Sequence, residues 1–476
     1  MPIDVEVVRS PGWWLKVLGR ELHARNRSPQ WSRVAKQRGE LRPPLELLWD
    51  YFRGDPPLPQ AADGWKAGFR EFLRMSRMNY AELVVEAARE RMVFSGFRTG
   101  AAGDENEDGQ ARKIMRANDF YVFAADVIQW MLALADGYAI VGKPRANGIP
   151  LLTAEDPRQT ITAHDAATGE YLAGLKLFRD DWDGTDFAHV FVPGQVHVAT
   201  RKSGTSALAG PTFRLNPRSW EWDEKASGDI PGGDGVIPIV RFRNRNGVGE
   251  YEPHLDVLDR INNTILDRVV ISKIQSFRQR AIRNLPDIDE KTGEVIDYTG
   301  MFDADPGALW KVPEGVEFWE SQPVDQGPIR ESIKDDVQGL ASVTRTPLHY
   351  VTPQAAEGSA EGATLMREGH IYRVEDRRNR AAGSMARVMA LAFRFMEDSE
   401  RSDPAMIEAL WKPAERFSLG ERFDAVSKAK GILPTEALWT DVLQYAPDEV
   451  PRLQAQRATD ILFVPPDVET EVPAGA

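Results

Sequence analysis

The segment GYAIVGKP, from Gly137 to Pro144, is the one stretch of this chain whose residue types and spacing match a catalytic motif. GxxxxGK is the pattern of a loop whose backbone N–H groups cradle phosphates. Three features argue against that function here. Pro144 stands where a serine or threonine hydroxyl would hold magnesium, the interior Tyr-Ala-Ile-Val is typical of a β-strand, and the following PRANGIP cannot begin a helix. The sequence therefore predicts a strand here and no nucleotide site.

Two further segments match binding motifs only in part. The GVG at Gly247–Gly249 lacks the third glycine of a dinucleotide fingerprint and a preceding buried parallel strand. Asp287 and Asp289 have the spacing of calcium-loop ligands. However, Lys291 and Thr292 occupy the positions that need a ligand and a tight-turn glycine. We therefore expect a turn into a helix at the first segment and no calcium at the second.

Cysteine and histidine contents limit the remaining chemistry. The chain has no cysteine and seven histidines, none of which forms an HExxH pair or a close cluster. Disulfides, thiolate metal sites and a cysteine nucleophile are thereby excluded, and no zinc centre is expected. A hydrolase with paired carboxylates stays open as an alternative function, but among 72 acidic residues some pair will always be eligible. We expect no enzyme activity, no cofactor and no metal.

The composition is that of a large globular protein. With 476 residues, 42% of them hydrophobic and 28% charged, the chain can bury a sizeable core and should divide into several lobes. Its first residues lack the pattern of a secretory signal, and no stretch approaches about 18 consecutive apolar residues, so we expect no membrane span. The net charge of −13 argues against a surface that wraps DNA tightly, but not against DNA that passes by without being held.

The elements before position 254 predict an α+β lobe. Residues 1–40 have the pattern of an exposed arm with a basic helical patch from Lys16 to Arg38. Apolar residues at helical spacing then predict helices over 41–51, 65–93 and 118–136. From 138 to 242 the hydrophobic period changes to two, with turn residues between short segments, which predicts an antiparallel β unit. The fold class is therefore α+β and mainly helical.

A helix, insert, helix, loop and long-helix order dominates the second half of the chain. An amphipathic helix at 255–283 ends in a basic tip, and an acidic, turn-rich insert follows at 284–325. A second amphipathic helix covers 326–346. After a Pro/Gly-containing loop at 347–359, a helix of about 39 residues is predicted at 360–398, roughly 58 Å long at 1.5 Å per residue.

The last part of the chain contains proline-separated segments. Beyond Ser402 we predict short helices, of which PAMIEALWKP at 404–413 is the first, and a disordered tail at 463–476.

The two amphipathic helices carry apolar stripes that one thin hairpin cannot bury. Side-by-side copies of the chain could bury them, which predicts a ring with contacts that close by rotation. The residues expected to pack between subunits in this way are Leu258, Ile265, Val269, Ile333, Val337 and Leu340.

The whole order of parts resembles the portal protein of tailed bacteriophages, or head-to-tail connector, of the long-tailed (siphovirus) type. The resemblance is carried by ELLWDYFRGDPPLP, NDFYVFAADVIQWMLALADGYAIVGKP, EYEPHLDVLDRIN, ALWKVPEGVEFWE and SVTRTPLHYVTPQAAEGSAEGATLMREGHIYRVEDRRNRAA. It is a pattern spread over residues 40–460, without one diagnostic short motif. Another capsid-associated adaptor or minor structural protein is the alternative, but adaptors are usually shorter and do not need this order of elements.

The resemblance implies a portal-like subunit with named parts. These are an α/β wing at 1–254, stem helices at 255–283 and 326–346, a small α/β clip at 284–325, a tunnel loop at 347–359, a long spine helix at 360–402 and a helical crown at 403–462. It also implies a ring of twelve copies at one capsid vertex, through which DNA is packaged and later ejected.

The resemblance further implies a set of partners. Double-stranded DNA would pass through the ring non-specifically. The ring would dock the terminase large subunit, head-completion or adaptor proteins and tail proteins, and it would contact the major capsid and scaffolding proteins. We expect assembly in the host bacterial cytoplasm and a final location in the virion.

The resemblance also assigns the residues that would meet DNA. The tunnel-loop residues are His349, Tyr350, Thr352 and Gln354, which are polar or aromatic without being cationic and suit weak, sequence-independent contact. In a ring of acidic subunits, a wall of the same sign as DNA would let the duplex slide. Two interpretations stay open for the basic residues, phosphate contact or pairing with the acidic clip of a neighbouring copy; these residues are Lys273, Arg278, Arg280, Arg283 and Arg345.

Overall fold

The fold is α+β and mainly helical, as the sequence predicts. The computed structural model describes residues 3–28, 31, 42–57, 67–101, 108–202, 219–276, 280–288, 293–298, 315–320, 322–351, 360–415, 419–443, 445 and 449–463. The chain divides into two compact units. The first unit comprises Met1–Pro57, Asn79–Leu255 and Gly339–Ala476, and the second comprises Leu58–Met78 and Asp256–Gln338.

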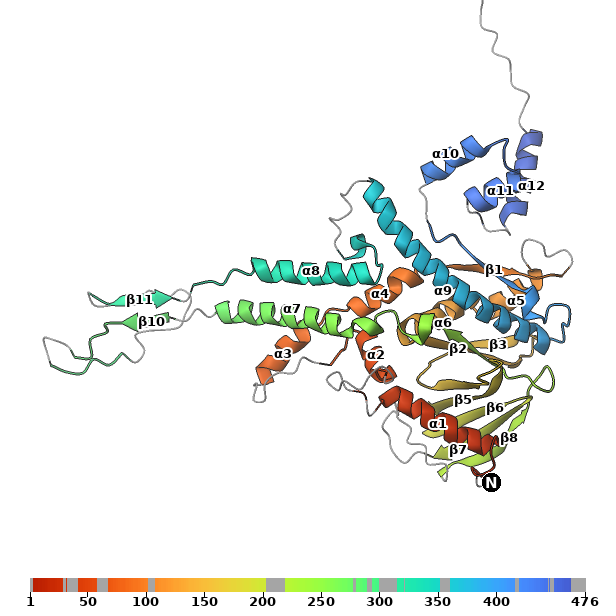
Figure 1. Ribbon diagram of the computed structural model, residues 1–476, viewed down its shortest axis with the longest axis horizontal. Helices are drawn as coiled ribbons and strands as arrows, with labels where there is room; N and C mark the ends of the chain where they lie inside the picture. Colours follow the sequence, from red (N-terminus) through yellow and green to blue (C-terminus); the bar gives the residue numbers. More distant parts are fainter. Residues whose placement is uncertain are drawn as a thin grey trace, which may run out of the picture. The chain divides into compact units, whose positions relative to one another are not determined.

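A five-stranded antiparallel sheet in the order β4-β5-β6-β7-β8 belongs to the first unit (Figure 1). Its strands are β4 (Thr160–His164), β5 (Tyr171–Asp180), β6 (Thr185–Val192), β7 (Gln195–Lys202) and β8 (Glu221–Asp229). The first four confirm the period-two prediction. The fifth strand, EWDEKASGD, was not predicted because its mostly polar residues give no alternating hydrophobic signal.

Helix α1 (Pro11–Arg27) covers one face of this sheet. Leu15, Leu18 and Leu22 form its buried stripe, within a hydrophobic cluster that includes Leu175 and Val190 of the sheet. The predicted exposed arm is therefore wrong for this helix. Lys16, Arg20 and Arg27 are exposed, Arg25 pairs with the buried Asp136 at 2.7 Å, and the leucines lie on the sheet, so the charge pattern concealed an amphipathic helix. Residues 32–40, the rest of the predicted basic patch, lie outside the described residues.

The segment with the catalytic-motif spacing is the central strand of a second, three-stranded antiparallel sheet. The sheet has the order β3-β2-β9, formed by β3 (Pro150–Glu155), β2 (Asp136–Pro144) and β9 (Ile239–Arg243). Helix α6 (Phe120–Leu134) packs on β2 so closely that a Cβ added to Gly137 would lie 2.4 Å from the carbonyl oxygen of Val127. The strand prediction is confirmed, and this glycine serves helix–strand packing.

The other helices of this part of the first unit are α2 (Leu45–Phe52), α4 (Tyr80–Arg89), α5 (Gly109–Ala117) and α9 (Ala360–Phe395). Helix α9 confirms the predicted long helix and ends close to the expected residue. It contacts α4 and runs past β2 and β9. A helix of this length is stabilised by such neighbours, since helical propensity alone does not hold it.

The segment PAMIEALWKP contains a strand, which corrects the predicted helix. A 3-10 turn at Pro404–Met406 is followed by β12 (Glu408–Trp411), which pairs antiparallel with β1 (Phe94–Arg98). The rings of Trp411 and Phe94 lie 5.2 Å apart, centroid to centroid. In this pairing Arg98 stands opposite Glu408, 310 residues later in the chain. Pairing with a distant strand therefore outweighs local helix propensity.

Downstream, the predicted helices are confirmed as α10 (Leu419–Ala429), α11 (Thr435–Ala437) with a π-helical turn at Leu438–Val442, and α12 (Glu449–Phe463). The predicted disordered tail lies, except for its first residue, outside the described residues.

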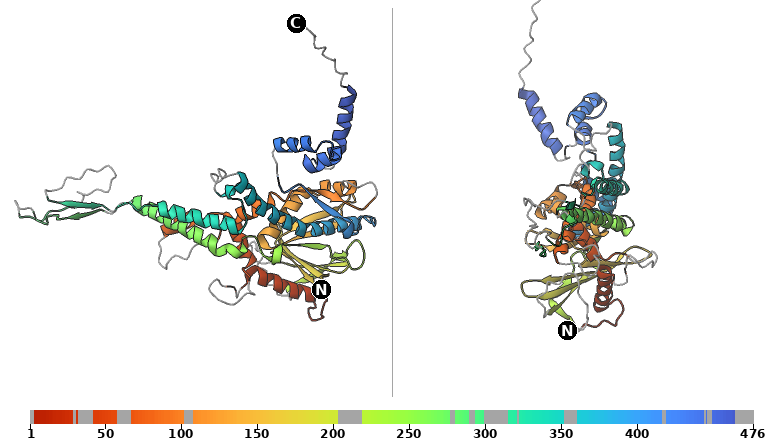
Figure 2. Two further views of the ribbon diagram at one scale, coloured as in Figure 1. Left: turned by 45° about the horizontal axis from the view of Figure 1, so that its top comes forward. Right: turned by 90° about the vertical axis from the view of Figure 1, so that its left-hand side faces the viewer.

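The second unit contains α3 (Ala67–Met75), β10 (Arg280–Arg283), β11 (Glu317–Glu320) and most of α7 (Leu255–Ser276) and α8 (Gly327–Val343). Helices α7 and α8 lie side by side and antiparallel (Figure 2). They are joined by an ion pair from Arg260 to Asp336 at 2.8 Å, and Gln326, just before α8, donates to Ser272 of α7 at 2.9 Å. Within the described part of the chain, no helix is both long and apolar enough to cross a membrane.

Helix α7 is shorter than predicted, so the prediction that the helix extends to residue 283 is wrong. The helix ends at Ser276, and residues 280–283 form a strand instead of continuing it. Lys273 lies exposed in the last turn of α7, whereas Arg278 lies outside the described residues.

Candidate functional site

The predicted tunnel-loop residues lie between α8 and α9. Two of them, His349 and Tyr350, form the 3-10 helix η4 (Leu348–Tyr350). The other two, Thr352 and Gln354, lie outside the described residues. The structure therefore shows how the segment leaves α8, but its predicted contact with DNA stays a prediction.

Neither described residue of this segment is cationic at neutral pH. The Tyr350 hydroxyl donates to Oε2 of Glu90 at 3.1 Å, and partial burial together with this carboxylate raises the pKa of Tyr350. Partial burial and the charges of Arg91 and Arg367 lower the pKa of His349. Both side chains are consequently neutral at pH 7, the property that favours weak contact with a polyanion.

Arg345 ends α8 with a left-handed backbone, at a φ of 53°. Its N–H donates to the carbonyl of Ser342 at 3.2 Å. The N–H of Thr346 donates to the carbonyl of Ala341 at 2.8 Å, which completes a Schellman motif. Glycine is the usual residue at this position, because a left-handed backbone costs other residues about 1 kcal/mol or more. An arginine is therefore unfavourable for the fold here, and its side chain is exposed.

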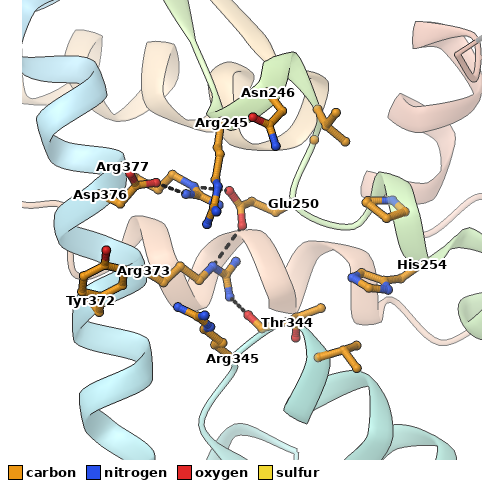
Figure 3. Close-up of a pocket in the computed structure, with 14 residues that line it drawn as sticks. Arg245, Asn246, Glu250, His254, Thr344, Arg345, Tyr372, Arg373, Asp376 and Arg377 are labelled. Atoms are coloured by element: carbon orange, nitrogen blue, oxygen red, sulfur yellow. Dashed lines mark hydrogen bonds and ion pairs between the residues drawn. The ribbon is translucent and has the colours of Figure 1, made fainter. Parts of the chain in front are cut away.

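Arg373 on α9 is a buried guanidinium that joins three other segments of the first unit (Figure 3). It donates to the carbonyl of Thr344 just after α8, to the carbonyl of Val84 in α4 at 2.8 Å, and to Oε2 of Glu250 at 3.0 Å. Because these partners come from three segments, Arg373 fixes the residues before the predicted tunnel loop to the helix that follows it.

His370, one turn earlier on α9, binds the same region. Its Nδ1 lies 3.1 Å from the carbonyl oxygen of Arg345, and its Nε2 lies 3.0 Å from that of Ala87 near the end of α4. Two facing carbonyls favour a doubly protonated ring. However, burial and the charge of Arg373 outweigh them and lower the pKa of His370 to about 4. At pH 7 the neutral ring therefore donates to one carbonyl and packs against the other.

Glu250 supplies the negative charge of this cluster. Its Oε1 accepts from Nε of Arg377 at 2.6 Å and from the Asn244 amide at 3.0 Å, while its Oε2 accepts from Arg373. Burial alone would raise the pKa of Glu250, but the two guanidinium groups outweigh burial and lower it. The carboxylate is therefore charged and fully paired inside the fold, as a buried charge must be.

The stability of the first unit is expected to fall by about 2 kcal/mol between pH 7 and pH 5 through His370 alone. The unfolded chain binds the histidine proton below about pH 6.5, whereas the folded chain binds it only near pH 4. The midpoint of urea unfolding measures this, at both pH values, for the wild type and His370→Gln. The substitution should make the midpoint less dependent on pH. Equal pH dependence in both proteins would contradict the assignment.

A cavity of about 340 Å³ lies beside this cluster (Figure 3). Arg245, from the turn before α7, and Arg345 line it from opposite sides, and Tyr372 on α9, whose side chain is exposed, also lines it. Neither Arg245 nor Arg345 has a carboxylate partner among the described residues. Asn246, also in the lining, has a left-handed backbone with a φ of 55°.

The residues expected to pack between subunits divide into two groups. Within the single chain, those that are already buried are Leu258, Ile265, Val337 and Leu340, with exposed fractions of 3%, 5%, 5% and 2%. The premise that the chain cannot bury this stripe is therefore wrong for these four. Val269 and Ile333 are only half-buried and retain surface for a neighbour. Packing between subunits stays a prediction, and Val269 and Ile333 are the two residues of the set with surface available for it.

The basic residues of β10 have acidic neighbours in the same chain. In the antiparallel register, Arg280 stands opposite Glu320 and Arg283 stands opposite Glu317. Opposite charges across two strands stabilise a hairpin by roughly 0.2–1 kcal/mol. For Arg283 and Glu317, which are both exposed, this register adds an intrachain interpretation to the two that the sequence left open.

The buried cluster of His370, Arg373 and Arg377 was not among the sequence-predicted site residues, although α9 contains a signal for it. Buried positions recur along α9 every three or four residues, through Ala381, Met385 and Val388. Extending that stripe toward the N-terminus places the histidine and both arginines on the buried face. Polar residues on a buried stripe indicate hydrogen-bonded, paired groups.

No metal site is visible among the residues that the structure describes, since no three His, Asp or Glu side chains there are grouped around one point. The histidines of the five-stranded sheet have other neighbours. His164 bonds to Thr162 at 2.9 Å, and His189 packs edge-on against Phe178.

Sequence comparison identifies the class of protein. The portal proteins of Mycobacterium phages D29 and L5 are each 20% identical to this chain, over 395 and 396 residues. Each alignment covers 77% of this chain and 76% of the relative. The family described as "Phage portal protein, SPP1 Gp6-like" matches residues 34–461. The chain belongs to this family of phage portal proteins.

Solved structures of gene transfer agent (GTA) particles are also similar to this chain. A chain from the neck of the native GTA particle, computed with C12 symmetry, is 14% identical, with a TM-score of 0.42 over 78% of this chain and 89% of that chain. A chain from the virion of the native particle is 13% identical, with a TM-score of 0.44 over 90% and 98%.

Proposed function

We propose that copies of this chain close into a ring at one capsid vertex and that the ring is the channel for DNA packaging and ejection. Membership of the portal family supports this proposal. The structural observation that carries it is the joining of α8 to α9 by Arg373 and His370. These contacts give the segment between the two helices a fixed base, which a loop that meets moving DNA requires.

The proposal divides the chain into the parts that the family resemblance implies. These are a wing at 1–254, stem helices α7 and α8, a clip at 284–325, a tunnel loop at 347–359, a spine helix α9 and a crown at 403–462. In the virion, the ring would dock the terminase large subunit and later the head-completion and tail proteins, and it would contact capsid and scaffolding proteins.

The proposed channel meets DNA weakly. His349 and Tyr350 are neutral, and each copy carries a net charge of −13, so a ring of about twelve copies repels a duplex more than it binds one. Arg345, Lys273 and the arginines of β10 are the groups that could touch phosphates.

Electron microscopy of the purified protein in negative stain tests the ring. Ring-shaped particles with a central hole are expected. A compact monomer at all protein concentrations would contradict the proposal and favour the hydrolase alternative, for which assembly is unnecessary.

Ile333→Asp is expected to abolish the ring while leaving folded subunits. Ile333 is half-buried in the single chain, so a charge there costs several kcal/mol only when a neighbour covers it. Light scattering should then report subunits in place of rings, with an unchanged circular dichroism spectrum.

Two control variants frame this result. Ser332→Asp puts the same charge on the exposed side of α8 and should leave rings intact. Leu340→Asp should unfold the subunit itself, because Leu340 is only 2% exposed. Full rings formed by Ile333→Asp would refute the stem assignment.

A further inference from the structure

The cavity beside the buried cluster has features of a binding site that the fold alone does not require. Two of its lining residues, Asn246 and Arg345, have left-handed backbones. Asparagine adopts this conformation readily, whereas for arginine it is strained, and strained residues are found at ligand clamps. At Arg345 the fold would be better served by glycine. An arginine at this position therefore favours a role other than stability of the single subunit.

The lining also carries an excess of positive charge. It contains four arginines and two carboxylates, Glu250 and Asp376. The carboxylates pair with Arg373 and Arg377, so the charges of Arg245 and Arg345 are left without a carboxylate partner among the described residues. His254, also in the lining, adds no charge at pH 7 because burial lowers its pKa. The cavity therefore has the charge to accept an oxyanion.

We propose that this cavity binds a carboxylate side chain of the neighbouring copy in the ring, between Arg245 and Arg345. This rests on the proposed function, since an adjacent copy is present only in a ring. Guanidinium groups donate two parallel N–H bonds to a carboxylate, which fixes its orientation as well as its charge. The centroid of the Tyr372 ring lies 6.0 Å from the guanidinium carbon of Arg345, at the outer limit of a cation–π contact.

The form of the cavity favours a side chain over the DNA backbone. Phosphates lie on the convex surface of a duplex, where protruding lysines and arginines reach them. A recess of about 340 Å³ is instead filled by a group on a flexible stem. The composition supplies such groups, because 72 acidic residues exceed 59 basic ones.

Arg345→Gly separates assembly from folding. The melting temperature of the isolated subunit should stay the same or rise, because glycine suits the left-handed backbone. The association constant of the ring should fall about ten-fold per contact, seen as dissociation at lower NaCl concentration in mass photometry. The matched control is Arg387→Ala, which removes an exposed arginine of α9 that lines no part of this cavity and should leave the salt dependence unchanged.

Arg345→Lys identifies the occupant. A water-soluble carbodiimide joins the introduced amine to a carboxylate in contact with it, forming an amide with loss of water to the reagent. In rings mixed from ¹⁴N and ¹⁵N copies, mass spectrometry should find peptides of mixed label linked through position 345 to an acidic residue. Links confined to one label would show an occupant from the same chain and overturn the proposal.

The remaining outcomes are also decisive. Arg345→Gly rings that resist salt as well as wild-type rings would contradict the cavity proposal alone. Salt-resistant Arg345→Gly rings that fail to retain DNA would assign the cavity to phosphates instead. Wild-type protein that forms no ring would contradict the proposed function itself, and the cavity proposal with it.

Discussion

Replacing Arg373 by leucine is expected to lower the free energy of unfolding of the first unit by about 3–5 kcal/mol. The guanidinium is 4% exposed and donates to Glu250 and to two backbone carbonyls. Leucine fills part of the volume but leaves both carbonyls without this donor. It also leaves Glu250 with one guanidinium where it had two. Urea unfolding followed by tryptophan fluorescence measures the loss.

Arg380→Leu is the matched control for that substitution. Arg380 lies two turns further along the same helix, is exposed, and pairs with Asp376. Exposed ion pairs contribute at most about 1 kcal/mol, so this variant should unfold near the wild-type midpoint. Similar losses in the two variants would mean that the buried cluster adds nothing beyond surface charge.

Deleting residues 352–358 is expected to leave rings intact and to lower the yield of DNA-filled particles by orders of magnitude. The deletion spares η4 and the contacts of Arg373 and His370, so the base of the loop keeps its structure. Electron microscopy counts the rings, and nuclease-protected DNA in assembled capsids measures packaging and retention.

A second variant separates the length of this loop from its chemistry. Replacing 352–358 by an equally long glycine and serine segment should restore packaging if reach alone matters, and only in part if Thr352 and Gln354 make the contact. Loss of rings in the deletion variant would show that the segment acts in assembly and would count against a tunnel-loop role.

The elements that were predicted correctly are those whose signal is local. Strand β2 and helix α9 each carry a long, regular hydrophobic pattern. This pattern can be recognised within the segment itself, without knowing which elements pack against it. The strand-like pattern of GYAIVGKP was also one reason to reject a phosphate-binding function. The structure adds that Gly137 is needed because the backbone of α6 lies too close for a side chain.

The errors occurred where distant partners decide the structure. Trp411 lies in a strand because β1 is available to pair with it, and Arg283 lies in a strand because β11 is. Neither partner is visible from a short window of sequence. The same limit concealed the cluster of Glu250 and Arg373, whose members are 123 residues apart and look like ordinary surface charges when each is considered alone.

The contacts of His370 and Arg373 also determine where mechanical load would travel. Each side chain contacts one backbone carbonyl just after the C-terminal end of α8 and one carbonyl within α4. A pull on the segment between α8 and α9 would stretch these bonds together, because one rigid helix carries both donors. Bonds loaded in parallel share the force and yield as a group, whereas bonds loaded in series open one at a time. If the loop meets DNA as proposed, its base would transmit tension from the passing duplex into α4 and α9.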